Sequence, residues 1–368
     1  MSRRCWLNKT IKVLHTEWSD GWGGQEIRII GEMLAVREQG VEVCLACRAH
    51  AAIKQKALEH QIPVFTLPFR GNADFKTLFA LRKLVKQHGI DIINTHSGKD
   101  TWVGGLAAKL SGAKFIRTRH LSNRIRANRT NFINELADYI FTTGESVRAD
   151  MIKYNRIKPE RIQSIPTGID AEVFDPALYN RRVCREQFDL QAGEIVIGII
   201  AVLRQFKRHD LFLEMAKTLI GQYPDKKLVF LIAGDGPQKD NLVTMAERLG
   251  LVSQIRFLGH VTQVPELLTA LDIFVLSSDS KEGVPQSVMQ ALLMNKAVVA
   301  TNSGSTRDLL GKDNFKLVDT HSQESLIKAV SDYIDNPKPV DPRQFILDGF
   351  SKSVMTQKIV KIYQELVA

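Results

Sequence analysis

The sequence has few of the features that mark secreted or membrane-spanning proteins. Its 368 residues contain four cysteines, Cys5, Cys44, Cys47 and Cys184, too few for a disulfide framework in a chain of this length. No apolar run approaches the roughly 18 residues that a transmembrane helix needs. The first residues are basic but lack the long apolar segment of a signal peptide. These absences predict a protein of the reducing cytoplasm.

The net charge of +10 is concentrated in the first half of the chain. Positions 1–176 hold 27 basic and 18 acidic residues, a net charge of +9, and the remainder holds 23 and 22. A basic run in the first half could meet anionic lipid, nucleic acid or an acidic substrate, or could be a solvated surface. Nucleic acid is disfavoured because no helix-turn-helix, zinc or aromatic-platform signature accompanies the run. The run comprises Arg117, Arg119, Arg124, Arg126 and Arg129.

Short apolar runs alternate with helical segments in both halves, as is typical of buried parallel strands. The polar stretch 175–194 has no strand character and is interpreted as an interdomain connection. The sequence therefore predicts an α/β protein of two doubly wound, Rossmann-like domains facing a cleft, at 1–176 and 177–350, with a helix at 351–368 packing across the pair. We expect strands at 11–15, 41–47, 90–95, 114–118, 139–143, 162–165, 195–201, 228–233, 255–258, 273–276, 297–300 and 315–318.

The most informative stretch runs from Leu276 to Thr301, LSSDSKEGVPQSVMQALLMNKAVVAT. It consists of an apolar strand, a turn with Glu282, Gly283 and Pro285, a helix and a second apolar strand. A strand followed by a helix N-terminus is where an α/β protein binds phosphate-bearing ligands.

Three further motifs precede this turn in the second half. Arg204 and Lys207 follow its first strand and are close enough in sequence to reach one diphosphate. The segments AGDGP at 233–237 and FLGH at 257–260 each end a strand. Taken singly, these motifs indicate only surface cations and tight turns.

In this order the four motifs resemble the second domain of family 4 glycosyltransferases, and a weaker resemblance covers the first half. The resemblance implies the GT-B fold and retaining transfer of a sugar from a nucleotide diphosphate sugar to a saccharide or lipid-linked acceptor. The chain has no D-x-D triplet of the kind that holds a metal ion on the diphosphate in single-domain sugar transferases. We therefore expect no metal and no cofactor, with cations, backbone N–H groups and a helix dipole meeting the leaving-group charge.

The resemblance also implies roles for the matching residues. Arg204 and Lys207 would neutralise the donor diphosphate, Glu282 would bind sugar hydroxyls, and the strand end at Leu258 would contact the nucleobase. His120 resembles the first-domain histidine near the reacting sugar and joins Arg204, Lys207 and Glu282 as a catalytic candidate; His96 remains undecided. The donor-binding set is completed by Gly23, Gly24, Gly234, Gly283, Val284, Pro285, Gln286, Ser287 and Gln290.

Two departures from the family pattern stand out. Gln290 occupies the place of a second glutamate that usually binds the ribose diol. The amide still accepts a hydrogen bond, worth about 1 instead of about 2 kcal/mol without the charge. In 302–308, Ser305, Arg307 and Asp308 also differ from the common residues, although Gly304 is kept.

Other interpretations are weaker. A dehydrogenase is disfavoured because no G-x-G-x-x-G follows the first strand. Cys44 and Cys47 form a C-x-x-C spacing on an apolar strand, so we expect buried thiols instead of a redox pair.

The expected function is synthesis of a bacterial lipopolysaccharide or polysaccharide, in the cytoplasm or on the inner face of its membrane through the basic run. The alternatives are a nucleotide-sugar epimerase or phosphorylase of the same fold, and a binding protein without turnover. The donor base and sugar, the acceptor and the oligomeric state stay open.

Overall fold

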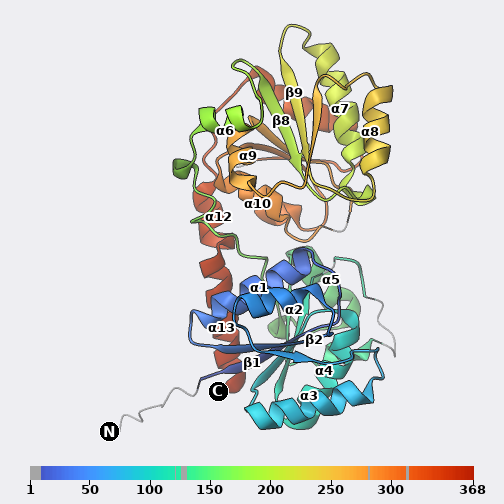
Figure 1. The fold of residues 1–368 in the computed structure, drawn as a ribbon, viewed down its shortest axis with the longest axis vertical. Coiled ribbons are helices and arrows are strands. Elements are labelled where there is room, and N and C mark those ends of the chain that lie inside the picture. The colour runs from blue at the N-terminus through green and yellow to red at the C-terminus, as the bar shows by residue number, and fades with distance from the viewer. Residues whose placement is uncertain (1–9, 121, 126–130, 281, 312–314) are drawn as a thin grey trace. The chain divides into compact units, whose positions relative to one another are not determined.

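The computed structural model describes residues 10–120, 122–125, 131–280, 282–311 and 315–368. The chain forms two compact units: Met1–Thr167 together with Met355–Ala368, and Gly168–Val354 (Figure 1). Each unit is built on one parallel β-sheet covered by helices on both faces. The predicted pair of doubly wound α/β domains is thereby confirmed.

The first sheet has the strand order β3-β2-β1-β4-β5-β6-β7. Its strands are β1 (Lys12–Glu17), β2 (Glu42–Cys47), β3 (Val64–Thr66), β4 (Ile92–Thr95), β5 (Lys114–Arg119), β6 (Tyr139–Thr142) and β7 (Ile162–Ser164). The helices are α1 (Gly24–Arg37), α2 (Ala52–Glu59), α3 (Phe75–His88), α4 (Gly98–Ser111), α5 (Glu145–Asn155) and α13 (Lys352–Val367), with short 3-10 turns η1 (Phe132–Leu136) and η2 (Pro159–Arg161).

Alternate residues of these strands enter two separate cores. Val13 packs with α1, α2 and α13 on one face, whereas Leu14 packs with α3 and α4 on the other. The cysteines of β2 follow the same alternation, because Cys44 enters one core and Cys47 the other. Both thiols are buried and free, as the sequence predicts.

The second sheet has the strand order β10-β9-β8-β11-β12-β13. Its strands are β8 (Ile195–Ile200), β9 (Leu228–Ala233), β10 (Ile255–Gly259), β11 (Ile273–Leu276), β12 (Ala297–Thr301) and β13 (Lys316–Val318). The helices are α6 (Arg181–Gln187), α7 (His209–Gln222), α8 (Lys239–Arg248), α9 (Val264–Ala270), α10 (Gln286–Leu293), α11 (Gln323–Asp335) and α12 (Arg343–Phe350), with 3-10 turns η3 (Pro176–Leu178), η4 (Gln205–Lys207) and η5 (Thr306–Leu309).

This sheet is also covered on both sides. Helices α7, α8 and α11 pack on one face, and α6, α9, α10 and α12 on the other. Figure 1 shows α7 and α8 side by side, away from α9 and α10. None of the described helices is long and apolar enough to cross a bilayer.

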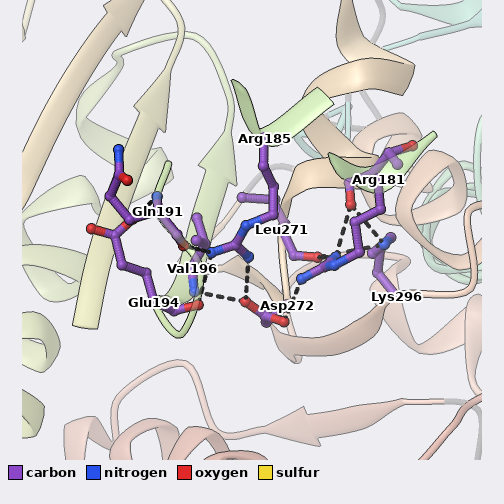
Figure 2. A network of polar contacts seen from close by, with 9 residues as sticks. Arg181, Arg185, Gln191, Glu194, Val196, Leu271, Asp272 and Lys296 are labelled. Atoms are coloured by element: carbon purple, nitrogen blue, oxygen red, sulfur yellow. Dashed lines mark hydrogen bonds and ion pairs between the residues drawn. The ribbon is translucent and has the colours of Figure 1, made fainter. Parts of the chain in front are cut away.

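The segment interpreted as an interdomain connection belongs to the second unit, so that interpretation was wrong. Arg181 of α6 donates hydrogen bonds to the carbonyl oxygens of Thr269 and Leu271, and its Nη2 lies 2.7 Å from Asp272 Oδ1 (Figure 2). Asp272 also accepts a hydrogen bond from the backbone N–H of Val196. These bonds fasten α6 to the amino ends of two sheet strands, which a polar composition alone does not reveal.

The division between the units also falls earlier than the predicted Pro176. Ile169 hydrogen-bonds the backbone of Phe350 and Lys352, and Arg343 donates to the carbonyl oxygens of Ala171 and Phe174. The second unit therefore starts at Gly168, and the chain returns to the first unit at Met355.

Helix α13 completes the core of the first unit. Met355, Ile359, Ile362 and Tyr363 are buried against α1 and the sheet. The hydroxyl of Tyr363 lies 3.4 Å from Glu32 Oε1 of α1. The last residues of the sequence thus stabilise a unit built from its beginning.

We predict that Ile359→Ala lowers the free energy of unfolding of the first unit by about 2–5 kcal/mol, because it leaves a cavity in a fully buried site. Urea denaturation followed by tryptophan fluorescence measures this, since all four tryptophans lie at or before position 102. The exposed Gln364→Ala on the same helix should change it by less than about 0.5 kcal/mol. Equal effects would contradict the assigned packing of α13.

Candidate functional site

The chain order of the second sheet reverses between its neighbouring strands β8 and β11. Ligands of open α/β sheets bind beyond the carboxyl ends of the strands at such a point. Lys207, in the turn after β8, and Glu282, in the loop after β11, meet here. Lys207 Nζ lies 2.5 Å from Glu282 Oε1, although the residues are 75 positions apart in sequence.

Two serines hold Glu282 in position, one through its side chain and one through its backbone. Ser278 Oγ donates to Glu282 Oε1 at 2.6 Å, and the backbone N–H of Ser305 donates to the Glu282 carbonyl oxygen at 3.2 Å. Gly304 has φ +54°, and a Cβ there would lie 1.9 Å from that carbonyl oxygen. Only glycine fits this contact, so the glycine kept in the 302–308 segment has a steric reason.

The rest of the turn leads into α10. Val284 is buried in the core, and Pro285 precedes the first helical residue, Gln286. The N-cap residue Pro285 provides no side-chain cap, and among the described residues no side chain bonds the first-turn N–H groups near Ser287, which can therefore meet an anion. Gln290, one turn further on, is half-buried.

Two glycine turns support the loop that carries Arg204. Gly234 has φ +145°, and a Cβ there would lie 1.9 Å from the Ala201 carbonyl oxygen. Its N–H donates to the carbonyl oxygen of Gly259, next to the half-buried Leu258. The ends of β8, β9 and β10 are thereby held together at one edge of the sheet.

A cavity of about 680 Å³ lies beside this edge, between the loop after β8, helix α8 and the loop after β11. Arg204 is exposed and lines it, together with Arg208, Gln238 and Asn241. None of the other predicted donor residues lines this cavity.

The order of the first sheet reverses between β1 and β4, where three histidines form a chain of hydrogen bonds. His15 Nδ1 lies 2.9 Å from His96 Nε2, and His96 Nδ1 lies 2.9 Å from His120 Nε2. His15 comes from β1, His96 follows β4 and His120 follows β5. The sequence prediction selected His120 and left His96 undecided. It missed His15, whose position near the end of a central strand was the available signal.

The chain of hydrogen bonds favours one set of tautomers. Nε2 of His15 is buried without a hydrogen-bond partner among the described residues. A buried acceptor without a partner is tolerated better than a buried N–H without one. We therefore infer that His15 and His96 donate from Nδ1, so that His120 carries its proton on Nδ1 and is a hydrogen-bond donor there.

Burial keeps these imidazoles neutral. It lowers the pKa of His15 to about 3. The pKa of His96 is lowered well below its usual range by burial and then by the neighbouring His15, and that of His120 by burial and then by Arg28. Neutral histidines at pH 7 can orient hydroxyl groups without placing a charge beside them.

The carboxyl groups of Asp100 and Glu17 lie close to this chain of histidines, and sequence reasoning missed both. Asp100 accepts hydrogen bonds from Thr16 Oγ1 at 2.6 Å and from the backbone N–H of His96 at 2.9 Å. Burial and the charge of Asp100 raise the pKa of Glu17 to about 7. Gln25 Nε2 donates to Glu17 at 2.6 Å, which ties the start of α1 to the end of β1.

The two glycines that begin α1 differ from those of the second unit. Gly23 has extended backbone and precedes the helix, and a Cβ at Gly24 would meet nothing within 4 Å. Packing within the chain therefore does not require glycine at Gly24.

The predicted lipid-facing arginine run is wrong for two of its members. Arg117 and Arg119 are 2% and 7% exposed, because they lie on β5 and point into the fold. Arg117 donates to the carbonyl oxygens of Thr95 and Thr118. Arg124 is exposed and pairs with Asp150, and the predictions for Arg126 and Arg129 lie outside the described residues.

Two doubly wound parallel sheets with polar groups at their switch points are the architecture of the GT-B fold, and the family comparison identifies the class as glycosyltransferases. The profile of Glycosyl transferases group 1 matches residues 180–346, and that of Glycosyltransferase Family 4 matches residues 22–173. The chain belongs to these group 1, family 4 glycosyltransferases, as the motifs predict.

Known proteins resemble the chain over nearly its full length. The UDP-Gal:α-D-GlcNAc-diphosphoundecaprenol α-1,3-galactosyltransferase of Escherichia coli is 24% identical over 97% of both chains. A glycosyltransferase of Rickettsia africae shares the fold with a TM-score of 0.88 at 19% identity, covering 97% of this chain and 99% of that one. Anabaena HepE, solved in complex with UDP, has a TM-score of 0.83 at 19% identity, covering 96% of this chain and 100% of that one.

Gly304→Ala should destabilise the second unit by more than about 2 kcal/mol, because the new Cβ collides with a backbone carbonyl at positive φ. Thermal denaturation followed by circular dichroism measures the change. Gly221→Ala is the matched control: a Cβ there meets nothing within 4 Å in α7, and alanine should stabilise the helix by up to about 1 kcal/mol. A Gly304→Ala protein as stable as wild type would refute this account of the loop.

A second prediction concerns pH. The pKa of His15 is lower in the folded protein, about 3, than the ordinary 6.5, so stability is full above about pH 6.5 and declines as the pH falls toward 3. Between pH 7 and pH 5 the free energy of unfolding should fall by about 2 kcal/mol less in His15→Asn than in the wild type. Urea denaturation at both pH values, followed by tryptophan fluorescence, measures the difference.

His50→Asn is the control for this prediction, because the side chain of His50 is 64% exposed and lies outside the chain of histidines, and its surface contact with Asp20 contributes little. It should leave the pH dependence unchanged. Glu17, with its raised pKa, favours low pH instead, but both variants retain it, so its contribution cancels. If the stability of His15→Asn depends on pH as the wild type's does, His15 is not buried as a neutral group.

Proposed function

We propose that the protein transfers a hexose from a UDP-sugar to a saccharide carried on a lipid diphosphate, with retention of configuration and without a bound metal ion. The relative from Escherichia coli, matched over 97% of both chains, supports the acceptor class and the donor by its stated activity. The HepE complex supports UDP as the nucleotide. Such an enzyme would act in the cytoplasm, at the membrane surface that carries the acceptor.

The observation that carries the proposal is the ion pair between Lys207 and Glu282 at the switch point. The ammonium group would move from the carboxylate to the donor diphosphate when UDP-sugar binds. Glu282, still held by Ser278, would then accept hydrogen bonds from the sugar hydroxyls. One ligand would in this way satisfy both members of the pair.

The neighbouring groups would complete the donor site. Arg204 and the uncapped first-turn N–H groups of α10 would share the diphosphate charge with Lys207. Gln290 would bind the ribose as a neutral acceptor, and the backbone near Leu258 would contact the base.

Transfer would need positioning and charge stabilisation in place of a protein nucleophile. The acceptor hydroxyl oxygen would form its bond to the anomeric carbon on the face from which the diphosphate leaves. The bond to the phosphate oxygen breaks, and that oxygen takes the proton of the hydroxyl. His120, neutral and donating from Nδ1, would orient a hydroxyl group of a saccharide substrate.

Lys207→Met should lower kcat/KM by about 10²–10³, because it removes the positive charge from the leaving diphosphate. Transfer from UDP-galactose to GlcNAc-diphosphate on a synthetic lipid, with the anomer assigned by NMR, measures this. Lys217→Met, an exposed lysine on α7, is the control and should be fully active. Unimpaired turnover by Lys207→Met would contradict the site.

Thermal shifts with UDP-, GDP-, ADP- and CMP-sugars test the nucleotide directly, since a ligand of the folded state raises its stability. Conversion of the donor without an acceptor would indicate an epimerase, and dependence on inorganic phosphate a phosphorylase. Binding without turnover of any kind would indicate a non-catalytic protein.

A further inference from the structure

The first unit contains a cavity of about 420 Å³ that the proposed donor site does not use. Helix α4, the end of β5, the loop at 123–125 and the turn η1 enclose it. Its volume lies within the roughly 300–1,000 Å³ typical of small-molecule sites. Arg117, Arg119 and Arg124 line it, and none of its lining residues is acidic.

Arg119 is the unusual member of this lining. Its side chain is 7% exposed and forms no ion pair with any carboxylate among the described residues. Nη2 donates to the backbone oxygen and to Oδ1 of Asn123, whereas Nε has no partner among the described residues. A buried cation without a counter-charge is unfavourable, so a bound anion would compensate it.

The acids near this lining act on the other two arginines: Asp100 attracts Arg117, and Asp150 pairs with Arg124 at 3.0 Å. From Arg117 to Phe132 the sequence contains no aspartate or glutamate. Arg117, also buried, adds a second positive charge, and burial together with Arg117 lowers the pKa of Arg119 to about 9. Arg119 therefore stays charged at neutral pH and has no carboxylate partner among the described residues.

The remaining wall has the chemistry of a sugar site. Trp102 lines the cavity, and its ring is fixed edge-on against Phe132 with centroids 5.1 Å apart. Asn123, Asn131 and Asn134 also line the cavity, where Asn123 Oδ1 accepts from Arg119 and Asn134 Nδ2 donates to the Asn131 carbonyl oxygen. An aromatic surface packs against the C–H groups of a pyranose, and amides hydrogen-bond its hydroxyls.

We propose that this cavity binds a glycosyl phosphate, with the phosphate on Arg119 and Arg124 and the sugar against Trp102. The proposal rests on the proposed function, and it identifies the cavity as the subsite for the phosphorylated reducing end of the acceptor. Arg119 and His120 are consecutive at the end of β5, so this subsite adjoins the histidine chain. A forked guanidinium suits a phosphate better than a point charge does.

Calorimetry on the full chain saturated with UDP tests this, because UDP occupies the donor site. GlcNAc 1-phosphate should bind the wild type, and Arg119→Gln should weaken it at least about tenfold. Arg119→Lys should recover part of the loss. Arg148→Gln is the control: this arginine of α5 pairs with Glu145 outside the cavity and should not change the affinity.

Arg124→Gln tests the same cavity even if Arg119→Gln does not fold. The side chain of Arg124 is 65% exposed, so its replacement should not disturb the fold. It should weaken GlcNAc 1-phosphate about two- to fivefold with an unchanged melting temperature. Free GlcNAc should bind more weakly than the phosphate and equally to wild type and Arg119→Gln.

GlcNAc-diphosphate on a dodecyl chain distinguishes the two sources of the phosphate. If Arg119→Gln weakens the binding of both probes equally, the subsite is supported. If only the lipid-linked probe binds, the subsite is supported and its natural phosphate is that of the lipid diphosphate. The proposal is overturned if neither probe binds at millimolar concentration, or if folded Arg119→Gln binds both like wild type. Failure of UDP to bind would instead refute the proposed donor site, since the same variant comparison can be made without UDP.

Discussion

The reversal of strand order at the centre of each sheet is the constraint on which the rest of the structure depends. At β8 and β11, and again at β1 and β4, successive segments leave neighbouring strands toward opposite faces. Their loops diverge, and polar side chains can meet beyond the strand ends without filling the core. Lys207 and Glu282, 75 residues apart, become an ion pair in this way, and His15 and His96, 81 residues apart, become hydrogen-bonded.

The two switch points use this geometry differently. The second unit places an ion pair there, with side chains 16% and 8% exposed. The first unit places neutral imidazoles there, because burial lowers their pKa values. A charged group selects a charged ligand, whereas a neutral chain of hydrogen bonds orients hydroxyl groups. The proposed division between diphosphate binding and sugar orientation follows from this difference.

The fold was predictable because apolar runs identify buried strands regardless of their contacts. Twelve strands were expected from such runs, and only β3 (Val64–Thr66), three residues between two prolines, was missed. Lys207 and Glu282 could be selected because each follows a central strand within a recognisable motif. Side-chain direction was not predictable in the same way. Arg117 and Arg119 were counted as surface charge, and a charge count does not reveal that they lie on β5, an inner strand buried on both faces.

The segment 175–194 was misassigned as a connection for a related reason. Its polar composition resembled a linker, but its arginines are used internally, on Asp272 and on carbonyl oxygens at the sheet edge. The histidine chain escaped notice because its members are scattered among three strands. Hydrogen bonds between distant segments leave no periodic pattern in the sequence.

The return of α13 to the first unit has a consequence for the order in which the protein forms during synthesis. Domains usually fold as they leave the ribosome, beginning with the N-terminal one. Here Ile359, Ile362 and Tyr363 belong to the core of the unit that is synthesised first. That unit cannot close its core until the whole second unit has been translated. The second unit, which is continuous in sequence, can therefore complete its core before the first unit does.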